Sequence, residues 1–143
     1  MVEDAKDASR STPSTGHVSR LLLIDDDTAL LTALSATIEF HLRPVRFDTC
    51  DSGTKALDLV RANRYDAIIV DMNMPSMSGL EFLVAVKQLR RDIPVLMISG
   101  HANEALIANA LEAGASDFIP KPFDRDQIVS AVRHGLEQSR SSA

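Results

Sequence analysis

The sequence lacks the features of several large protein classes. It has one cysteine, Cys50, in 143 residues, which excludes an internal disulfide framework and is typical of a reducing compartment. No apolar run approaches the roughly 18–20 residues of a membrane span. No hydrophobic stretch precedes Leu21, so we expect no secretory signal. We therefore expect a cytoplasmic protein without membrane contact.

Basic residues are also scarce. The chain has 15 Lys and Arg against 20 Asp and Glu, a formal net charge of −5, which argues against a nucleic-acid binding face. No Cys and His spacing resembles a zinc site, and no glycine-rich loop resembles a Walker or dinucleotide motif. The sequence therefore predicts no direct contact with nucleic acid.

The apolar content, 45% of the residues, is sufficient for the core of one domain. We expect residues 1–18 to form a disordered leader, because they are rich in Ser, Thr, Asp and Lys. Residues 19–139 are expected to form the folded domain, and residues 140–143 a frayed end. Neither end is expected to contain a second domain.

The period of the hydrophobic pattern alternates between that of strands and that of helices. Segments 20–25 and 67–70 are continuously apolar, as in the buried middle of a parallel sheet. Segment 45–49 alternates apolar and polar residues and predicts an edge strand. Further strands are predicted at 93–98 and 118–119, and helices at 28–42, after Ser52, from the Ser78 and Glu81 capping pair, at 102–113 and at 124–138.

Five strands alternating with five helices predict an α/β fold with a doubly wound, five-stranded parallel sheet. The two continuously apolar strands should be central and the alternating strand should lie at an edge. This favours the flavodoxin-like strand order 2-1-3-4-5, in which the first and third strands are neighbours. Ligands in such sheets bind at the carboxyl ends of the strands, beside that point.

Carboxylates follow both central strands. Asp25 and Asp26 end the first strand and Asp71 ends the third, so the predicted strand order brings them together. Hard oxygen ligands gathered in this way suit Mg²⁺. The alternative is that such aspartates cap helices, which we prefer for Asp27. For the other three, the charge at two neighbouring strand ends exceeds any need for caps.

Two hydrogen-bond donors follow the last two strands. Ser99 follows the predicted fourth strand and Lys121 follows the fifth. A hydroxyl and an ammonium on the same rim as a metal are suitable donors for a phosphoryl group. Alone, Ser99 could be a turn residue and Lys121 a solvated loop residue. Together with the three carboxylates, they favour a site for a metal and a phosphoryl group.

These segments resemble the receiver domain of bacterial two-component response regulators. The resemblance covers about residues 19–138, in the family's order. The matching motifs are Ile24-Asp25-Asp26, Asp71-Met72-Asn73-Met74-Pro75 with Gly79, Ser99-Gly100, and Phe118 with Lys121-Pro122-Phe123.

The resemblance implies a metal site and a phosphoacceptor. Asp71 would accept a phosphoryl group from a sensor histidine kinase or a phosphotransfer protein. Asp26 would bind Mg²⁺ directly, and Asp25 would assist, mostly through water. Asp71 and the backbone carbonyl of Asn73 would complete the protein ligands.

The resemblance also implies a conformational switch. Lys121 would pair with the phosphoryl oxygens, and the Ser99 hydroxyl would move to donate a hydrogen bond to one of them. Phe118 occupies the aromatic switch position, and the Lys121–Pro122 bond would be cis. The response would reach a surface built from the fourth helix, fifth strand and fifth helix. The expected partner of this surface is a downstream effector protein or effector domain. A phosphorylation-dependent homodimer is the alternative.

Two other functions fit the same fold. A phosphorylation-independent interaction module usually lacks an acidic residue or the lysine, and this chain has them all. A Mg²⁺-dependent phosphohydrolase places a general-acid aspartate two residues after its nucleophile, where this chain has Asn73. We therefore expect a signalling switch and not an enzyme. It would catalyse its own phosphorylation and slow self-dephosphorylation only.

Overall fold

The computed structural model describes residues 17–74 and 77–142. Most of the predicted leader, residue Pro75 of the third-strand motif, and Ala143 of the predicted frayed end lie outside these residues. Strands and helices alternate along the whole described chain. They are β1 Ser19–Ile24, α1 Thr28–Leu42, β2 Val45–Cys50, α2 Gly53–Ala62, β3 Ala67–Asp71, α3 Gly79–Leu89, β4 Val95–Ser99, α4 Glu104–Glu112, β5 Asp117–Pro120 and α5 Arg125–Ser142.

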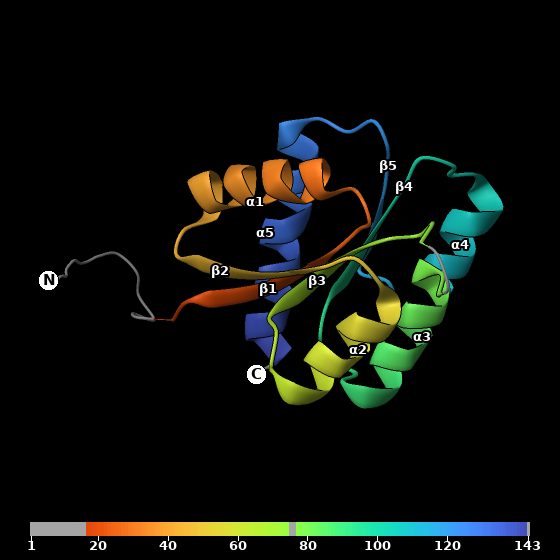
Figure 1. The fold of residues 1–143 in the computed structure, drawn as a ribbon, viewed down its shortest axis with the longest axis horizontal. Coiled ribbons are helices and arrows are strands. Elements are labelled where there is room, and N and C mark those ends of the chain that lie inside the picture. Colours follow the sequence, from red (N-terminus) through yellow and green to blue (C-terminus); the bar gives the residue numbers. More distant parts are fainter. Residues whose placement is uncertain (1–16, 75–76, 143) are drawn as a thin grey trace, which may run out of the picture.

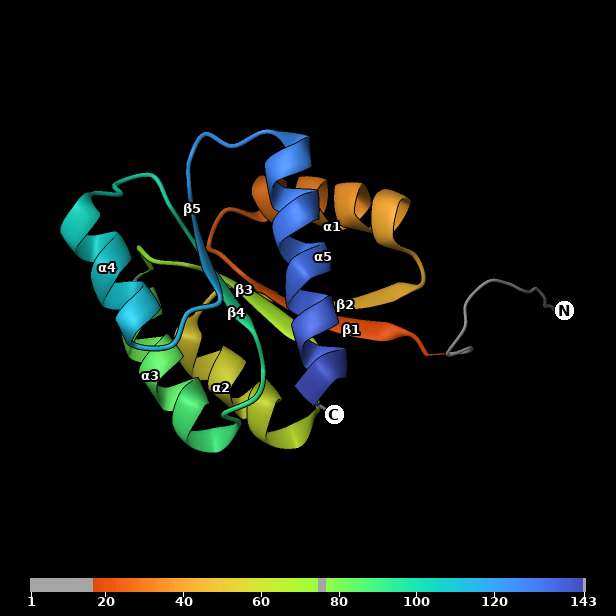
Figure 2. The same ribbon diagram turned by 180° about the vertical axis from the view of Figure 1, so that it is seen from behind.

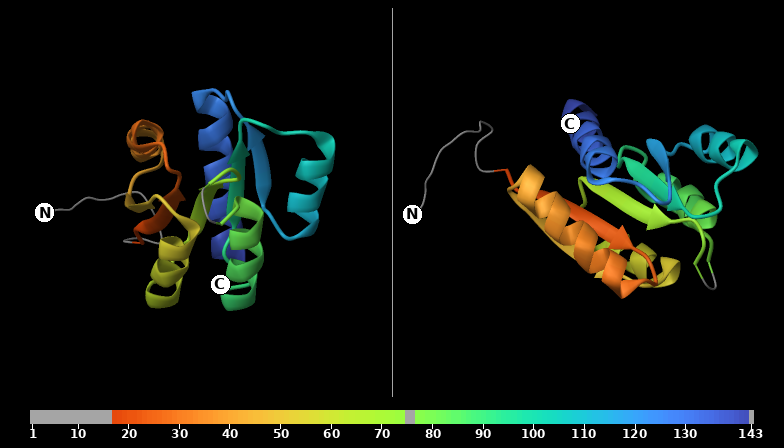
Figure 3. Two further views of the ribbon diagram at one scale, coloured as in Figure 1. Left: turned by 45° about the vertical axis from the view of Figure 1, so that its right-hand side comes forward. Right: turned by 90° about the horizontal axis from the view of Figure 1, so that it is seen from above.

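The five strands form one parallel sheet in the order β2-β1-β3-β4-β5. Helices α1 and α5 cover one face, and α2, α3 and α4 cover the other (Figures 1 and 2). The arrowheads of β1 and β3 point the same way (Figure 3), so the loops that follow them leave from one edge of the sheet. The predicted fold class and strand order are confirmed.

The central strands supply both halves of the core. On β1, Leu22 and Ile24 pack into the cluster beneath α2 and α3, whereas Leu21 and Leu23 pack into the cluster beneath α1 and α5. Successive side chains of a strand point to opposite faces, so a continuously apolar strand fills both clusters. Each of these side chains is at most 1% exposed, and burying each one contributes about 2 kcal/mol.

Side-chain caps determine where several helices begin. The Asp27 carboxylate accepts a hydrogen bond of 3.1 Å from the Leu30 N–H, as expected for an N-cap. Ser78 and Glu81 form the predicted capping box at the start of α3. These caps could be predicted because they depend only on residues three positions apart.

Three predicted boundaries differ from the structure by two residues or more. The fourth strand begins at Val95 and not at residue 93, and Pro94 has no N–H to donate to the ladder. Helix α4 begins at Glu104, two residues later than predicted. The Asn103 side chain accepts a hydrogen bond from the Leu106 N–H and caps the helix at this point.

The closing helix also differs from its prediction. We expected it to end at residue 138, but the backbone of α5 stays helical to Ser142. Its sequence between Arg125 and Gln138 is rich in charged and polar residues.

Within the described ranges, the structure has no helix that is both long and apolar enough to cross a membrane.

Candidate functional site

The carboxyl ends of β1 and β3 bring three carboxylates together. Ile24 is paired with Val70, so the next residues on the two strands, Asp25 and Asp71, are neighbours. Oxygens of Asp25, Asp26 and Asp71 all lie within 4.8 Å of one another. Asp25 is 1% and Asp71 is 5% exposed, whereas Asp26 is open to solvent. The structure therefore gathers three of the four predicted metal ligands into one half-buried cluster.

Backbone donors and one lysine orient the two buried carboxylates. Asp25 Oδ1 accepts from the Asp27 N–H at 3.0 Å, and Asp71 Oδ1 accepts from the Asn73 N–H at 3.2 Å. The other oxygens face Lys121, whose Nζ lies 3.5 Å from Asp25 Oδ2 and 3.8 Å from Asp71 Oδ2. Lys121 therefore interacts with both strand ends.

This cluster is short of positive charge. Burial raises the pKa of the Asp25 carboxyl above its usual range, and the nearby Asp71 charge and a hydrogen bond with Asp26 raise it further. The Asp27 N–H and Lys121 act in the opposite direction without outweighing these effects. Among the residues that the structure describes, these three carboxylates have one ammonium beside them, that of Lys121, and they are chemically suited to a hard divalent cation such as Mg²⁺.

A glycine holds the loop that carries Asp71 against the start of α3. The Gly79 N–H donates to the Met72 carbonyl at 2.9 Å. A Cβ at Gly79 would lie 2.7 Å from both the Asp71 carbonyl oxygen and the Met72 Cα, so no larger side chain fits without moving the backbone. The glycine of the matched motif therefore has a steric role in placing Asp71.

Ser99 and Lys121 are adjacent at the ends of β4 and β5. Ser99 is fully buried, and its carbonyl accepts from the Lys121 N–H at 2.7 Å. The Lys121–Pro122 bond is cis, as the resemblance implied. The Ser99 Oγ donates to Asn73 Oδ1 at 3.1 Å and accepts from the His101 N–H at 3.0 Å. The resemblance implied a role for the Asn73 carbonyl, and the structure adds the contact of its side chain with Ser99.

Comparison with known proteins decides the family. The sequence profile described as the response regulator receiver domain matches residues 21–133. The chain belongs to this family. Response regulator MprA of Mycobacterium sp. strain KMS is 32% identical over 120 residues, covering 84% of this chain and 51% of that protein. Response regulator protein TodT of Pseudomonas putida is 35% identical over 130 residues, covering 89% and 56%.

Solved structures agree on the fold. A CheY-like response regulator receiver domain protein from Methanospirillum hungatei JF-1 superposes with a TM-score of 0.82 at 24% identity, covering 89% of this chain and 100% of that one. The chain spans about half the length of the curated relatives it matches. The similarity therefore identifies a receiver domain of two-component signalling.

The aromatic residue at the predicted switch position, Phe118, lies in the core. Phe118 on β5 is 8% exposed and belongs to the same core cluster as Met97 and Ala110, beneath α4. The structure therefore places the predicted switch ring inside the core, next to the strand that ends in Ser99.

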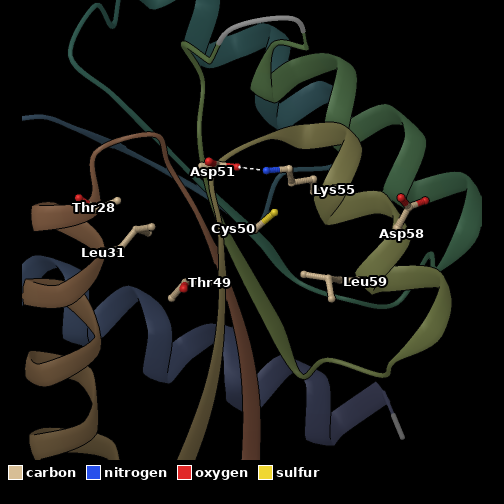
Figure 4. Close-up of a pocket in the computed structure, with 8 residues that line it drawn as sticks. All are labelled: Thr28, Leu31, Thr49, Cys50, Asp51, Lys55, Asp58 and Leu59. Atoms are coloured by element: carbon tan, nitrogen blue, oxygen red, sulfur yellow. Dashed lines mark hydrogen bonds and ion pairs between the residues drawn. The ribbon is translucent and has the colours of Figure 1, made fainter.

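A separate concavity of about 610 Å³ lies between α1 and α2 at the end of β2 (Figure 4). Cys50 and Leu31 contribute apolar surface, and the exposed Lys55 Nζ pairs with Asp51 at 3.1 Å on its rim. Its lining residues, all within the described part of the chain, do not include the clustered carboxylates or Lys121. This concavity is therefore distinct from the acidic site of the receiver.

Proposed function

We propose that this receiver domain is a phosphorylation-controlled signalling switch, in which Asp71 accepts a phosphoryl group from a sensor histidine kinase or a phosphotransfer protein. One observation carries the proposal: two buried carboxylates on adjacent strands, Asp25 and Asp71, share a single lysine. An arrangement with unbalanced charge destabilises the fold, so its presence favours a functional explanation.

The proposed transfer uses Oδ2 of Asp71, the oxygen that faces Lys121. Oδ1 is held by the Asn73 N–H, whereas Oδ2 faces Lys121. This oxygen attacks phosphorus, and the P–N bond to the donor histidine breaks as the O–P bond forms. The electron pair returns to the imidazole, and an acyl phosphate remains on Asp71. Lys121 donates to a phosphoryl oxygen, since catalysis of this step is mainly positioning and charge neutralisation.

The carboxylates of Asp25, Asp26 and Asp71 would hold Mg²⁺, with the backbone carbonyl of Asn73 as a further ligand. The donor set supports this assignment, because carboxylate and carbonyl oxygens are the ligands that Mg²⁺ prefers. When bound, the ion supplies positive charge to the phosphoryl oxygens.

Phosphorylation would then change the receiver's surface. The added negative charge attracts the Ser99 hydroxyl, and the movement of Ser99 alters the packing around Phe118, which lies on the neighbouring strand. The change would reach α4, β5 and α5 and be read by a downstream effector protein or effector domain, in the cytoplasm. A homodimer formed through this surface is a second form of output. The domain would turn over no external substrate.

Intact mass after incubation with acetyl phosphate and Mg²⁺ tests the proposal. We expect one added phosphoryl group on the wild-type chain, none on Asp71→Asn and none without metal. Asp58→Asn is a matched control, because this exposed aspartate on α2 pairs with Arg61, which is not part of the acidic cluster. It should be phosphorylated like the wild type.

Beryllofluoride binding covers the case of rapid hydrolysis. If no phosphoryl group is detected but beryllofluoride binds with Mg²⁺, the site is active and the acyl phosphate is short-lived. If neither adduct forms, the phosphorylation proposal is wrong, and a phosphorylation-independent interaction module becomes the better interpretation.

A further inference from the structure

The single proton of the Ser99 hydroxyl is already engaged. Its Oγ donates to Asn73 Oδ1 at 3.1 Å, and it accepts from the His101 N–H at 3.0 Å. A serine hydroxyl has one O–H to donate. While Asn73 accepts that proton, Ser99 cannot donate to a phosphoryl oxygen on Asp71.

The loop that carries Asp71 also positions the Asn73 carboxamide. The Asn73 N–H donates to Asp71 Oδ1, and Gly79 packs this loop closely against α3. Ser99 is fully buried, so its hydroxyl has little access to water as an alternative partner. The Asn73 residue itself is exposed. The Asn73–Ser99 hydrogen bond is therefore held in place by the loop, but the Ser99 hydroxyl can exchange it for another acceptor.

We propose that the Asn73–Ser99 hydrogen bond is a latch that opposes the movement of Ser99 toward a phosphorylated Asp71. The proposal rests on the phosphorylation of Asp71 proposed above. On switching, the Ser99 O–H exchanges its hydrogen bond to a neutral amide oxygen for one to a charged phosphoryl oxygen. The charged oxygen is the stronger acceptor. In the absence of a phosphoryl group, the latch keeps the switched state at low population.

The expected size of the effect follows from the chemistry of the bond. The latch is one neutral hydrogen bond with an exposed partner, so its loss should shift the equilibrium by about three- to tenfold. The direction is toward the switched state, and ligands that resemble the phosphoryl group should therefore bind more tightly.

A double-mutant cycle with beryllofluoride and Mg²⁺ tests the latch. The four proteins are the wild type, Asn73→Ala, Ser99→Ala and the double variant. We expect Asn73→Ala to tighten beryllofluoride binding by about three- to tenfold in the Ser99 background. In the Ser99→Ala background, where no proton is available to hold, it should have no effect. An equal change in both backgrounds, or no change in either, would overturn the latch.

The backbone N–H of His101 gives a second, independent readout. Because it donates to Ser99 Oγ, its NMR signal reports the position of the hydroxyl. In ligand-free Asn73→Ala, we expect this signal to move toward its position in the beryllofluoride-bound wild type. A signal that stays at the ligand-free wild-type position would contradict the proposal.

The controls separate this inference from the proposed function. Asp58→Asn, which lies outside the acidic cluster, should bind beryllofluoride with Mg²⁺ like the wild type. If the wild type binds beryllofluoride and the cycle shows no coupling, the latch alone is wrong. If no protein in the cycle binds beryllofluoride, the proposed function fails and the latch fails with it.

Discussion

Two clusters of ionisable side chains on the same sheet differ in their charge balance. Around Arg20, near the start of β1, Asp48 accepts hydrogen bonds from Arg20 Nη2 at 3.0 Å and Tyr65 Oη at 2.6 Å. Asp66 accepts from the Arg20 N–H at 2.8 Å and lies 3.4 Å from His17 Nε2. We call these five residues the amino-end cluster; its two carboxylates face a guanidinium, a phenol and an imidazole.

The carboxyl-end cluster of Asp25, Asp26, Asp71 and Lys121 is different. Its two buried carboxylates lie 3.5 and 3.8 Å from the same ammonium, and the third adds further negative charge. A cluster that only holds strands together can satisfy each of its groups internally. A site that receives a cation and a phosphoryl group has to leave charge unbalanced until they bind. The same substitution should therefore have opposite effects on the two clusters.

Asp48→Asn should produce the largest effect. It removes the charge that Arg20 and Tyr65 share, and hydrogen bonds to charged groups are strong, so the free energy of unfolding should fall by about 2 kcal/mol. Urea unfolding followed by circular dichroism measures this. Asp58→Asn, on the exposed surface of α2, is the control and should change stability by less than about 0.5 kcal/mol. An equally small effect of Asp48→Asn would break the comparison.

Tyr65→Phe should lower the free energy of unfolding by about 1.5 kcal/mol at neutral pH, through loss of the bond to Asp48. Burial and that hydrogen bond raise the pKa of Tyr65. The unfolded chain therefore ionises first, and the stabilisation is lost as the pH rises past about 10. Urea unfolding measures the difference in free energy of unfolding between the wild type and Tyr65→Phe. This difference should be about 0.8 kcal/mol smaller at pH 10.5 than at pH 7.5. A constant gap would contradict this assignment.

Asp25→Asn should instead raise the free energy of unfolding. It relieves the repulsion among buried carboxylates, and an Asn oxygen can still accept from the Asp27 N–H, so the metal-free protein should gain about 1 kcal/mol. Thermal unfolding with and without saturating Mg²⁺ provides the contrast. Mg²⁺ should stabilise the wild type and have little effect on the variant. Destabilisation of the metal-free variant would show that the charge at this end is already balanced.

Lys55→Met should have the smallest effect, although it also breaks an ion pair. Lys55 and Asp51 are 69% and 57% exposed on the rim of the concavity in Figure 4, so the pair is well solvated. We expect a change of less than about 0.5 kcal/mol in the free energy of unfolding. A loss as large as that of Asp48→Asn would mean that burial does not distinguish the two kinds of pair.

Much of the carboxyl-end cluster was predictable from sequence. Asp25 and Asp71 directly follow continuously apolar segments, and such segments indicate central strands of a parallel sheet. Once the strand order is known, the geometry of the sheet brings the residues after those strands together. The amino-end cluster carries no comparable signal. Arg20 and Asp48 are 28 residues apart, and each is an ordinary charged residue of a strand.

The boundary of α4 was also predicted wrongly because the sequence carries no clear signal for it. The cap of α3 was predicted because Ser78 and Glu81 form a recognisable pair. Asn103 caps α4 without a matching partner three residues later, so hydrophobic periodicity alone extended that helix too far. Local patterns identify an element more reliably than they identify its ends.

The sequence by itself determined the alternation of strands and helices, the order of the strands and the edge at which the carboxylates meet. These properties depend on hydrophobic period and on topology, which are readable along the chain. Only the tertiary structure decided which atoms are paired. Lys121 reaches Asp25 across 96 residues, and Ser99 donates to Asn73 across 26. Hydrogen bonds depend on distances and directions within a few tenths of an ångström, and these are set only when the whole chain packs.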